Sequence, residues 1–76
     1  MPVAPEGVAF VEVIVNGERR TLPAKLSIGE LLRKLDIPAD RVAVERNRTI
    51  VPREAWETVQ VEAGDELEIV HFVGGG

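Results

Sequence analysis

Cysteine is absent from this chain, histidine occurs once (His71), and aromatic residues make up only 4% of it. Without cysteine, the sequence excludes a disulfide framework, a thiolate metal site and a thiol nucleophile. A single histidine excludes a metal centre or a catalytic pair built from several histidines. No apolar run reaches the length of about 18 residues that a membrane-spanning helix needs. These absences favour a small domain that binds no metal and enters no membrane.

The length of 76 residues allows one hydrophobic core and no second domain. Residues 1–8 contain two prolines and a glycine but no basic residue, which predicts a disordered leader rather than a signal peptide. We expect a folded domain over residues 9–73 and a flexible glycine tail over residues 74–76. Without a signal peptide or a membrane span, the expected location is the cytoplasm.

Acidic residues outnumber basic ones, and the formal net charge is −4. All nine lysines and arginines lie within residues 1–53, whereas residues 54–76 carry six acids and no base. The negative charge and the scarcity of aromatic side chains argue against nucleic-acid binding. The last third of the chain is therefore an acidic segment, which serves either solubility or the attraction of a basic partner protein.

The first half of the chain predicts a β-hairpin followed by one helix. Alternating valines over residues 9–15 predict a strand whose valines face the core. Asn16-Gly17 predicts a tight turn into a polar edge strand over residues 18–22. A serine–glutamate capping box and apolar residues at helical spacing then predict a helix over residues 28–35.

The second half predicts three further strands. Alternation over residues 41–46 predicts a strand, Asn47-Arg48 a tight turn, and residues 49–51 a short strand that ends before a proline. The last strand is expected over residues 66–73. Because a helix between two strands of one sheet crosses over right-handed and leaves them parallel, the order ββαβββ predicts a mixed sheet. We predict an α+β chain with the β-grasp fold, in which a mixed, curled sheet packs on one main helix.

No pattern in the sequence predicts an active site, since a domain of this size has little room for a catalytic pocket beside its core. Glu66 and Glu68 share one face of the last strand, where exposure to solvent is the simplest interpretation. His71 lies at the same alternate positions as the inward residues Leu67 and Ile69. We therefore expect it at the inner rim of that strand, with a local hydrogen bond. Trp56 is expected to close the core beneath a loop.

Three glycines, Gly74, Gly75 and Gly76, directly follow the last apolar strand. Glycine lets a backbone lie extended in a narrow channel without a side-chain clash. The carboxylate of a terminal glycine is unhindered, and it becomes an acyl donor once another protein adenylates it. A passive flexible tail is the alternative interpretation.

A β-grasp domain that runs into a C-terminal diglycine resembles the ubiquitin-like family and, within it, the ThiS family of sulfur carriers for thiamin thiazole biosynthesis. The resemblance covers roughly residues 11–76 and rests on these segments: Val15-Asn16-Gly17-Glu18, Leu31-Leu32, Val42-Ala43-Val44-Glu45-Arg46-Asn47, Ile50-Val51-Pro52-Arg53 with Trp56, Gly64-Asp65, and Glu68-Ile69-Val70 through Gly76. The series from Val51 to Asp65 is the more specific signal, because all ubiquitin-like modifiers share the diglycine.

The resemblance implies a protein co-substrate rather than an enzyme. A ThiF-like, ATP-dependent adenylating enzyme would convert the Gly76 carboxylate into an acyl-adenylate, and sulfur from a cysteine desulfurase would displace AMP to leave a thiocarboxylate. Gly74 and Gly75 would let the tail enter the channel of the partner. A ThiG-like thiazole synthase would accept the sulfur. ATP and magnesium belong to the activating partner, so this chain is expected to bind no cofactor.

The outward side of the last strand offers a docking site beside the tail. If the strand alternates as predicted, Val70 and Phe72 point outward, and Glu66 and Glu68 form an acidic rim. An exposed apolar spot with a charged rim is typical of protein interfaces. We expect Phe72 to anchor the adenylating enzyme; the alternative is that Phe72 only covers a sheet face.

Three other functions fit the same residues. A sulfur carrier for another acceptor, such as the small subunit of molybdopterin synthase or a carrier for tRNA thiolation, would use the same tail. A ubiquitin-like modifier would form isopeptide bonds with lysines. A β-grasp interaction module would make no use of its glycines.

Overall fold

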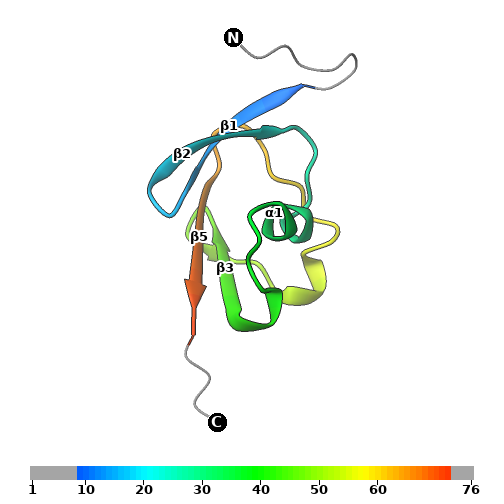
Figure 1. The fold of residues 1–76 in the computed structure, drawn as a ribbon, viewed down its shortest axis with the longest axis vertical. Coiled ribbons are helices and arrows are strands. Elements are labelled where there is room, and N and C mark those ends of the chain that lie inside the picture. The colour runs from blue at the N-terminus through cyan, green and yellow to red at the C-terminus, as the bar shows by residue number, and fades with distance from the viewer. Residues whose placement is uncertain (1–8, 73–76) are drawn as a thin grey trace.

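The computed structural model describes residues 9–72 (Figure 1). The expected leader at residues 1–8 and the expected tail at residues 74–76 lie outside the described residues, as does Val73. The strands and the main helix follow the predicted order, and two short 3-10 helices lie between them: β1 (Phe10–Val15), β2 (Glu18–Pro23), α1 (Ile28–Lys34), η1 (Ala39–Arg41), β3 (Val42–Arg46), β4 (Thr49–Ile50), η2 (Arg53–Ala55) and β5 (Glu66–His71).

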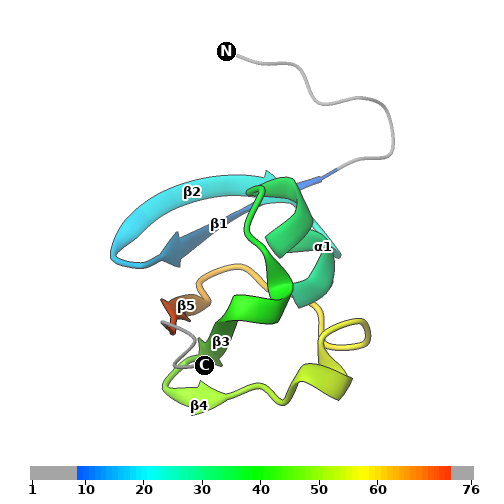
Figure 2. The same cartoon turned by 60° about the horizontal axis from the view of Figure 1, so that its bottom comes forward.

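The five strands form one mixed sheet in the order β2-β1-β5-β3-β4. The last strand of the chain therefore lies at the centre of the sheet, parallel to β1 and antiparallel to β3. Figure 2 shows α1 on one side of the sheet, with the β1–β2 hairpin and the β3–β4 hairpin at opposite edges. The β-grasp prediction is confirmed. Within residues 9–72, no helix is long and apolar enough to cross a membrane.

Both predicted tight turns have the backbone that a two-residue hairpin requires. Asn16 and Gly17 have φ values of 50° and 81°, and Asn47 and Arg48 have φ values of 51° and 70°. Two successive residues with positive φ match the right-handed twist of the flanking strands, which is why asparagine and glycine are preferred there. The second turn carries an arginine at the position where the first carries glycine.

The side chain of Asn16 continues the pairing of β1 with β5 after β1 has ended. The backbone N–H of Asn16 donates to the Leu67 carbonyl at 2.9 Å. Its side-chain amide then acts as a further peptide group: Nδ2 donates to the Ile69 carbonyl at 3.3 Å, and Oδ1 accepts from the Ile69 N–H at 2.7 Å. One side chain thus binds the central strand to the hairpin turn.

The helix is held at both its start and its apolar face. Ser27 caps it, accepting a hydrogen bond from the Glu30 N–H at 3.0 Å, while the Glu30 carboxylate accepts from the Ser27 N–H at 2.9 Å. This reciprocal box satisfies two N–H groups that have no partner within the helix. Burial of the apolar face supplies most of the stability of so short a helix.

The core lies between α1 and the inner face of the sheet. Its buried apolar members are Val13, Val15, Leu22, Ile28, Leu31, Leu32, Val42, Val44, Val51, Trp56, Val61, Leu67 and Ile69. Trp56 is 4% exposed, and its indole N–H donates to the Val51 carbonyl at 2.8 Å. The prediction that Trp56 closes the core is confirmed, and its polar group has a partner, as a buried indole requires.

Replacement of Asn16 by glycine tests the link between the hairpin turn and β5. Glycine accepts the positive φ, so N16G removes only the two side-chain hydrogen bonds to Ile69. Each such bond contributes about 0.5–1.5 kcal/mol net, so the free energy of unfolding should fall by about 1–3 kcal/mol in urea denaturation. Lys25 has a φ of 68°, and no side-chain hydrogen bond is found for it among residues 9–72. K25G is therefore the matched control and should change stability little. Equal stabilities of N16G and K25G would contradict this role of Asn16.

Candidate functional site

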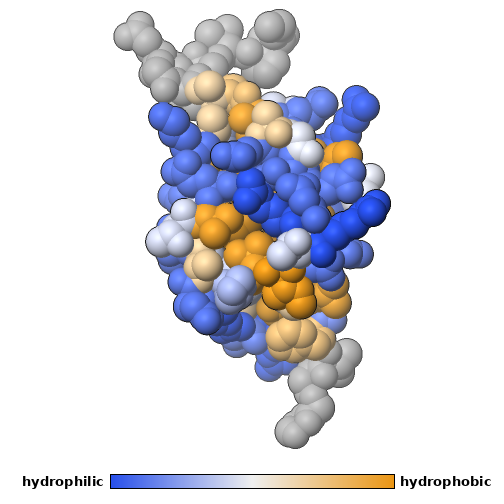
Figure 3. Space-filling view, turned by 180° about the vertical axis from the view of Figure 1, so that it is seen from behind, coloured by the Kyte–Doolittle hydropathy of each residue, from blue (hydrophilic) through white to orange (hydrophobic). Residues whose placement is uncertain are grey.

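The outward face of β5 carries two exposed apolar side chains next to the end of the strand. Val70 is 45% exposed and Phe72 is 49% exposed, whereas Leu67 and Ile69 are buried in the core. This alternation follows from the pleat of a strand, which sends successive side chains to opposite faces. The predicted outward direction of Val70 and Phe72 is confirmed. Figure 3 shows an apolar area, in orange, that extends between hydrophilic surfaces toward the C-terminal end.

The register of the sheet places acidic side chains beside this apolar face. Glu45 on β3 is paired with Glu68, and Ala43 is paired with Val70. On the other side of β5, Ile14 of β1 is paired with Glu66. Like charges directly opposite each other on neighbouring strands are unfavourable, and this arrangement is typical of a surface whose charges serve a partner rather than the fold.

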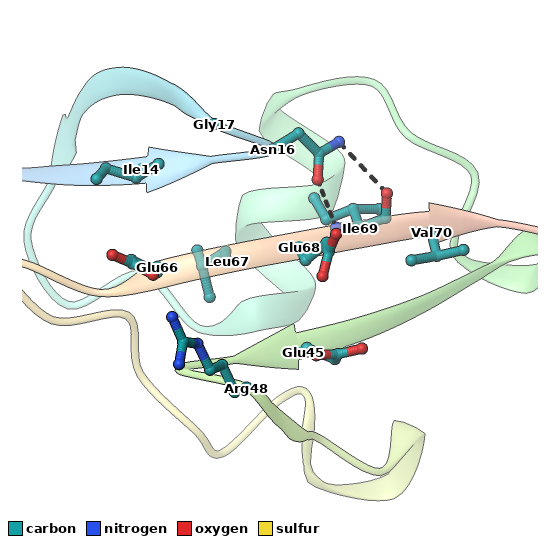
Figure 4. A pocket seen from close by; sticks show the side chains of 10 residues that line it. All are labelled: Ile14, Asn16, Gly17, Glu45, Arg48, Glu66, Leu67, Glu68, Ile69 and Val70. Carbon is teal, nitrogen blue, oxygen red and sulfur yellow. Dashed lines mark hydrogen bonds between the residues drawn. The ribbon is translucent and has the colours of Figure 1, made fainter.

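A pocket of about 670 Å³ covers this part of the sheet. Its lining residues come from β1, β3, β5 and the two tight turns: Ile14, Asn16, Gly17, Glu45, Arg48, Glu66, Leu67, Glu68, Ile69 and Val70 (Figure 4). We call this surface the sheet pocket. Glu45, Glu66, Glu68 and Arg48 form no ion pair with one another or with any other side chain in the described part of the chain. The sheet pocket thus combines apolar area with unpaired charge, which suits a protein surface better than a small molecule.

A second polar cluster, centred on Asp65, fixes the start of β5. Asp65 is 5% exposed, and its carboxylate accepts hydrogen bonds from Arg46 Nε at 2.8 Å, Asn47 Nδ2 at 3.1 Å and the Glu62 N–H at 2.8 Å. Asn47 also accepts a hydrogen bond from the Glu66 N–H at 2.9 Å. Sequence reasoning did not find these contacts of Asp65, because Arg46 and Asn47 lie 19 and 18 residues away in the chain.

The electrostatics of Asp65 are dominated by two opposing effects. Burial has the largest single effect and alone would raise the pKa of the carboxyl group. The hydrogen bonds from Glu62, Arg46 and Asn47, together with the positive charge of Arg46, outweigh burial, so the pKa of Asp65 lies below its usual value. The carboxylate form therefore stabilises the fold.

His71 does not occupy the inner-rim environment that the alternation of side chains along the last strand predicts. Its side chain is exposed, and no hydrogen bond to it is found among residues 9–72, so the expected local hydrogen bond is not present. The reason is that β1 ends at Val15, opposite Leu67. No strand covers that side of β5 at position 71.

The described residues contain no arrangement with the chemistry of an active site. Within residues 9–72, no group of three or more histidine, aspartate or glutamate side chains is placed to hold a metal ion. Gly74, Gly75 and Gly76, which sequence reasoning assigned to the reactive tail, lie outside the described residues. What the structure does bring together is Val70, Glu66 and Glu68 in the sheet pocket, with Phe72 beyond them on the same face of β5.

Comparison with protein families identifies one family. The ThiS family model matches residues 13–76, which includes the second half of β1, the other four strands, the helix and the three glycines. Among curated proteins, the sulfur carrier protein ThiS of Bacillus subtilis is 42% identical over 50 residues, which cover 66% of this chain and 76% of that protein.

A second kind of relative is much longer than this chain. A thiazole synthase of Paramagnetospirillum magneticum is 44% identical over 66 residues, covering 87% of this chain and 20% of the relative. The chain thus spans about a fifth of the length of the thiazole synthases that it matches.

Comparison with solved structures gives the same family. The crystal structure of the thiamine biosynthesis protein ThiS of Geobacter metallireducens superposes with a TM-score of 0.78 and 36% sequence identity. The match covers 87% of this chain and all of that one.

The Asp65 cluster predicts a specific pH dependence of stability. Because the pKa of Asp65 is lowered in the folded protein, the unfolded chain binds more protons in acid. The contribution is therefore complete above the unfolded carboxyl pKa of about 3.9 and is lost as the pH falls through the lower folded value. D65N, which cannot ionise, should be less stable than the parent by about 1.5–3 kcal/mol at pH 7.

Urea denaturation of D65N and the parent at a series of pH values between 7 and about 2.5 measures this effect. The difference in stability should shrink as the pH falls below about 4. E54Q, which removes an exposed carboxyl group, is the control and should follow the parent. A stability difference for D65N that stays constant with pH would show that ionisation of Asp65 contributes nothing.

Proposed function

The chain belongs to the ThiS family, and we propose that it works as a sulfur carrier in thiamine biosynthesis. In this proposal the chain is a protein co-substrate rather than an enzyme, and the carrier group is a thiocarboxylate formed on Gly76. The observation that carries the proposal is the extent of the family match, which runs through residue 76 and so includes the glycine tail. The absence of an active-site arrangement among residues 9–72 is compatible with this role.

Two group transfers on the Gly76 carboxylate would load the sulfur. First, a carboxylate oxygen attacks the α-phosphorus of ATP, pyrophosphate leaves, and an acyl-adenylate is formed. Second, a thiol reductant releases hydrosulfide from the persulfide of the sulfur donor and leaves a disulfide; the hydrosulfide attacks the carbonyl carbon, the C–O bond to AMP breaks, and a thiocarboxylate, AMP and a proton result. Adenylation is necessary because oxide is a poor leaving group, whereas AMP is a good one.

All the catalytic groups for these steps would belong to partners. We propose a ThiF-like adenylating enzyme that binds ATP and magnesium, a cysteine desulfurase or another sulfur donor, and a thiazole synthase that accepts the sulfur. Gly74 and Gly75 lack a Cβ, so they would let the backbone enter a narrow active-site channel. The acidic segment of residues 54–76 would steer the tail toward a basic partner surface.

Phe72 is the proposed anchor for the adenylating enzyme. It is half exposed on the outward face of β5, and its N–H donates to the carbonyl of Arg41, the last residue of η1, at 3.1 Å, so its backbone is held in place just before β3 begins. An exposed aromatic side chain on fixed backbone suits a binding hot spot, because little side-chain entropy is lost on docking. Val70 would extend the apolar contact, with Glu66 and Glu68 at its acidic rim.

Intact mass spectrometry tests the loading of sulfur. The chain is incubated with ATP, magnesium, a ThiF-like adenylating enzyme, a cysteine desulfurase with cysteine, and a thiol reductant. We expect a mass gain equal to the replacement of one oxygen by sulfur, and no gain in a variant that lacks Gly76. An unchanged mass with an adenylating enzyme that is active on another carrier would contradict the proposal.

The anchoring role of Phe72 predicts a loss of adenylation without a loss of folding. F72D should lower the rate of ATP–pyrophosphate exchange by about 100-fold, the effect of losing a hot spot worth roughly 2–3 kcal/mol. Phe10 is 45% exposed and lies at the far end of β1, so F10D is the matched control and should keep the parental rate. Normal exchange by F72D, or an equal loss in F10D, would overturn the assignment.

A further inference from the structure

Arg48 occupies a backbone position at which the same molecule uses glycine elsewhere. The two tight turns have nearly the same conformation, with second-residue φ values of 81° at Gly17 and 70° at Arg48. A left-handed conformation is unfavourable for a residue with a Cβ and is tolerated mainly by glycine and asparagine. The chain thus accepts local strain to keep a long cationic side chain at this turn. Strain that serves no packing is often found at binding sites.

The side chain of Arg48 does not serve the fold in any contact among the described residues. It is exposed, it forms no hydrogen bond or ion pair there, and it lines the sheet pocket at the end near Glu66 (Figure 4). Arg46, two residues earlier, is the contrasting case, because its guanidinium is bound to Asp65 and Glu62. Arg48 is the cation of a pocket that also contains Glu45, Glu66 and Glu68.

The position of Arg48 along the sheet separates it from the tail. Phe72 lies six residues beyond Glu66, and a strand rises about 3.3 Å per residue, so the two ends of this face are about 20 Å apart. If both partners receive the same glycine tail, the tail alone cannot make the chain bind one partner rather than the other. Groups at the other end of the face can distinguish them.

We propose that Arg48, with the adjoining Glu45 and Ile14 of the sheet pocket, forms the part of this face that recognises thiazole synthase, whereas the Phe72 anchor at the other end of the face recognises the adenylating enzyme. This proposal rests on the proposed function. The choice of partner follows from the relatives in which a segment like this chain forms a fifth of a thiazole synthase.

Charge complementarity defines the chemistry of the partner surface. Arg48 would meet a carboxylate, with which a guanidinium forms two parallel hydrogen bonds. Glu45 would meet a lysine or arginine side chain, and Ile14 would meet an apolar contact. Glu66, Glu68 and Val70 belong to the stretch of β5 that either partner would contact. Pairing with a partner would also relieve the repulsion between Glu45 and Glu68.

Replacement of Arg48 by glycine tests the proposal, because glycine suits the backbone of the turn and removes only the side chain. Binding of the unmodified chain to thiazole synthase is measured by titration calorimetry, so no sulfur loading is needed. R48G should weaken binding by about tenfold or more, as expected for the loss of a paired guanidinium. Adenylation by the ThiF-like enzyme should be unchanged, and the melting temperature should stay within about 3 °C of that of the parent.

K25G is the matched control, because it also removes one positive charge from a residue with positive φ, and Lys25 does not line the sheet pocket. K25G should bind thiazole synthase as the parent does. Parental affinity of R48G, an equal loss in K25G, a fall in adenylation by R48G, or a large fall in its melting temperature would each overturn the proposal. A parent chain that gains sulfur but does not bind thiazole synthase would overturn the choice of partner and leave the carrier function intact.

Discussion

The parallel pairing of β1 with β5 is the contact on which the rest of the molecule depends. It joins the first and last strands of the domain through only two register pairs, Ile14 with Glu66 and Val15 with Leu67. The side-chain amide of Asn16 lengthens this short ladder by one further step at Ile69. Because β5 also pairs with β3 along five residues, it becomes the central strand. Every element of the fold is thereby tied, directly or through a neighbour, to the strand that precedes the glycine tail.

Placing β5 at the centre of the sheet divides its residues between two tasks. Leu67 and Ile69 are buried against the helix side and contribute to stability, whereas Val70 and Phe72 are exposed on the other face. The two sets alternate along one strand, so residues that are neighbours in sequence can be changed with separate effects. The proposed carrier role needs this separation, since the chain would have to stay folded while it binds one partner after another. The outward face is available for binding by partner proteins, and the inward face holds the strand against the core.

Local patterns in the sequence were sufficient to predict most of the fold. The Asn16-Gly17 turn, the capping box at Ser27 and the alternation of β5 each depend on residues within a few positions of one another. The burial of Trp56 was also predicted. Each of these features is decided by backbone preference or by periodicity, and the structure confirms them. The outward direction of Val70 and Phe72 followed from the same periodicity.

The features that sequence reasoning missed depend on contacts between distant parts of the chain. The Asn16 side chain meets Ile69 across 53 residues, and the Asp65 carboxylate meets Arg46 across 19. The exposure of His71 depends on where β1 ends relative to β5. The alternation of side chains along β5 does not reveal where its neighbouring strand ends. The sheet pocket likewise needs the register of β3, since only that register brings Glu45 beside Glu68. The part of the candidate site that β5 and Phe72 contribute was therefore predictable from the sequence. The part that Ile14, Glu45 and Arg48 contribute was not, because only the assembled sheet brings them beside β5.

Transfer of isotopically marked sulfur tests the central claim most directly. The chain is loaded with ³⁴S at Gly76, purified away from the loading enzymes, and mixed with thiazole synthase and its small-molecule substrates. If the chain is the sulfur carrier for thiazole formation, mass spectrometry should find ³⁴S in the thiazole ring and a Gly76 carboxylate restored on the protein. Retention of ³⁴S on Gly76, with no marked thiazole formed by an active synthase, would contradict the account.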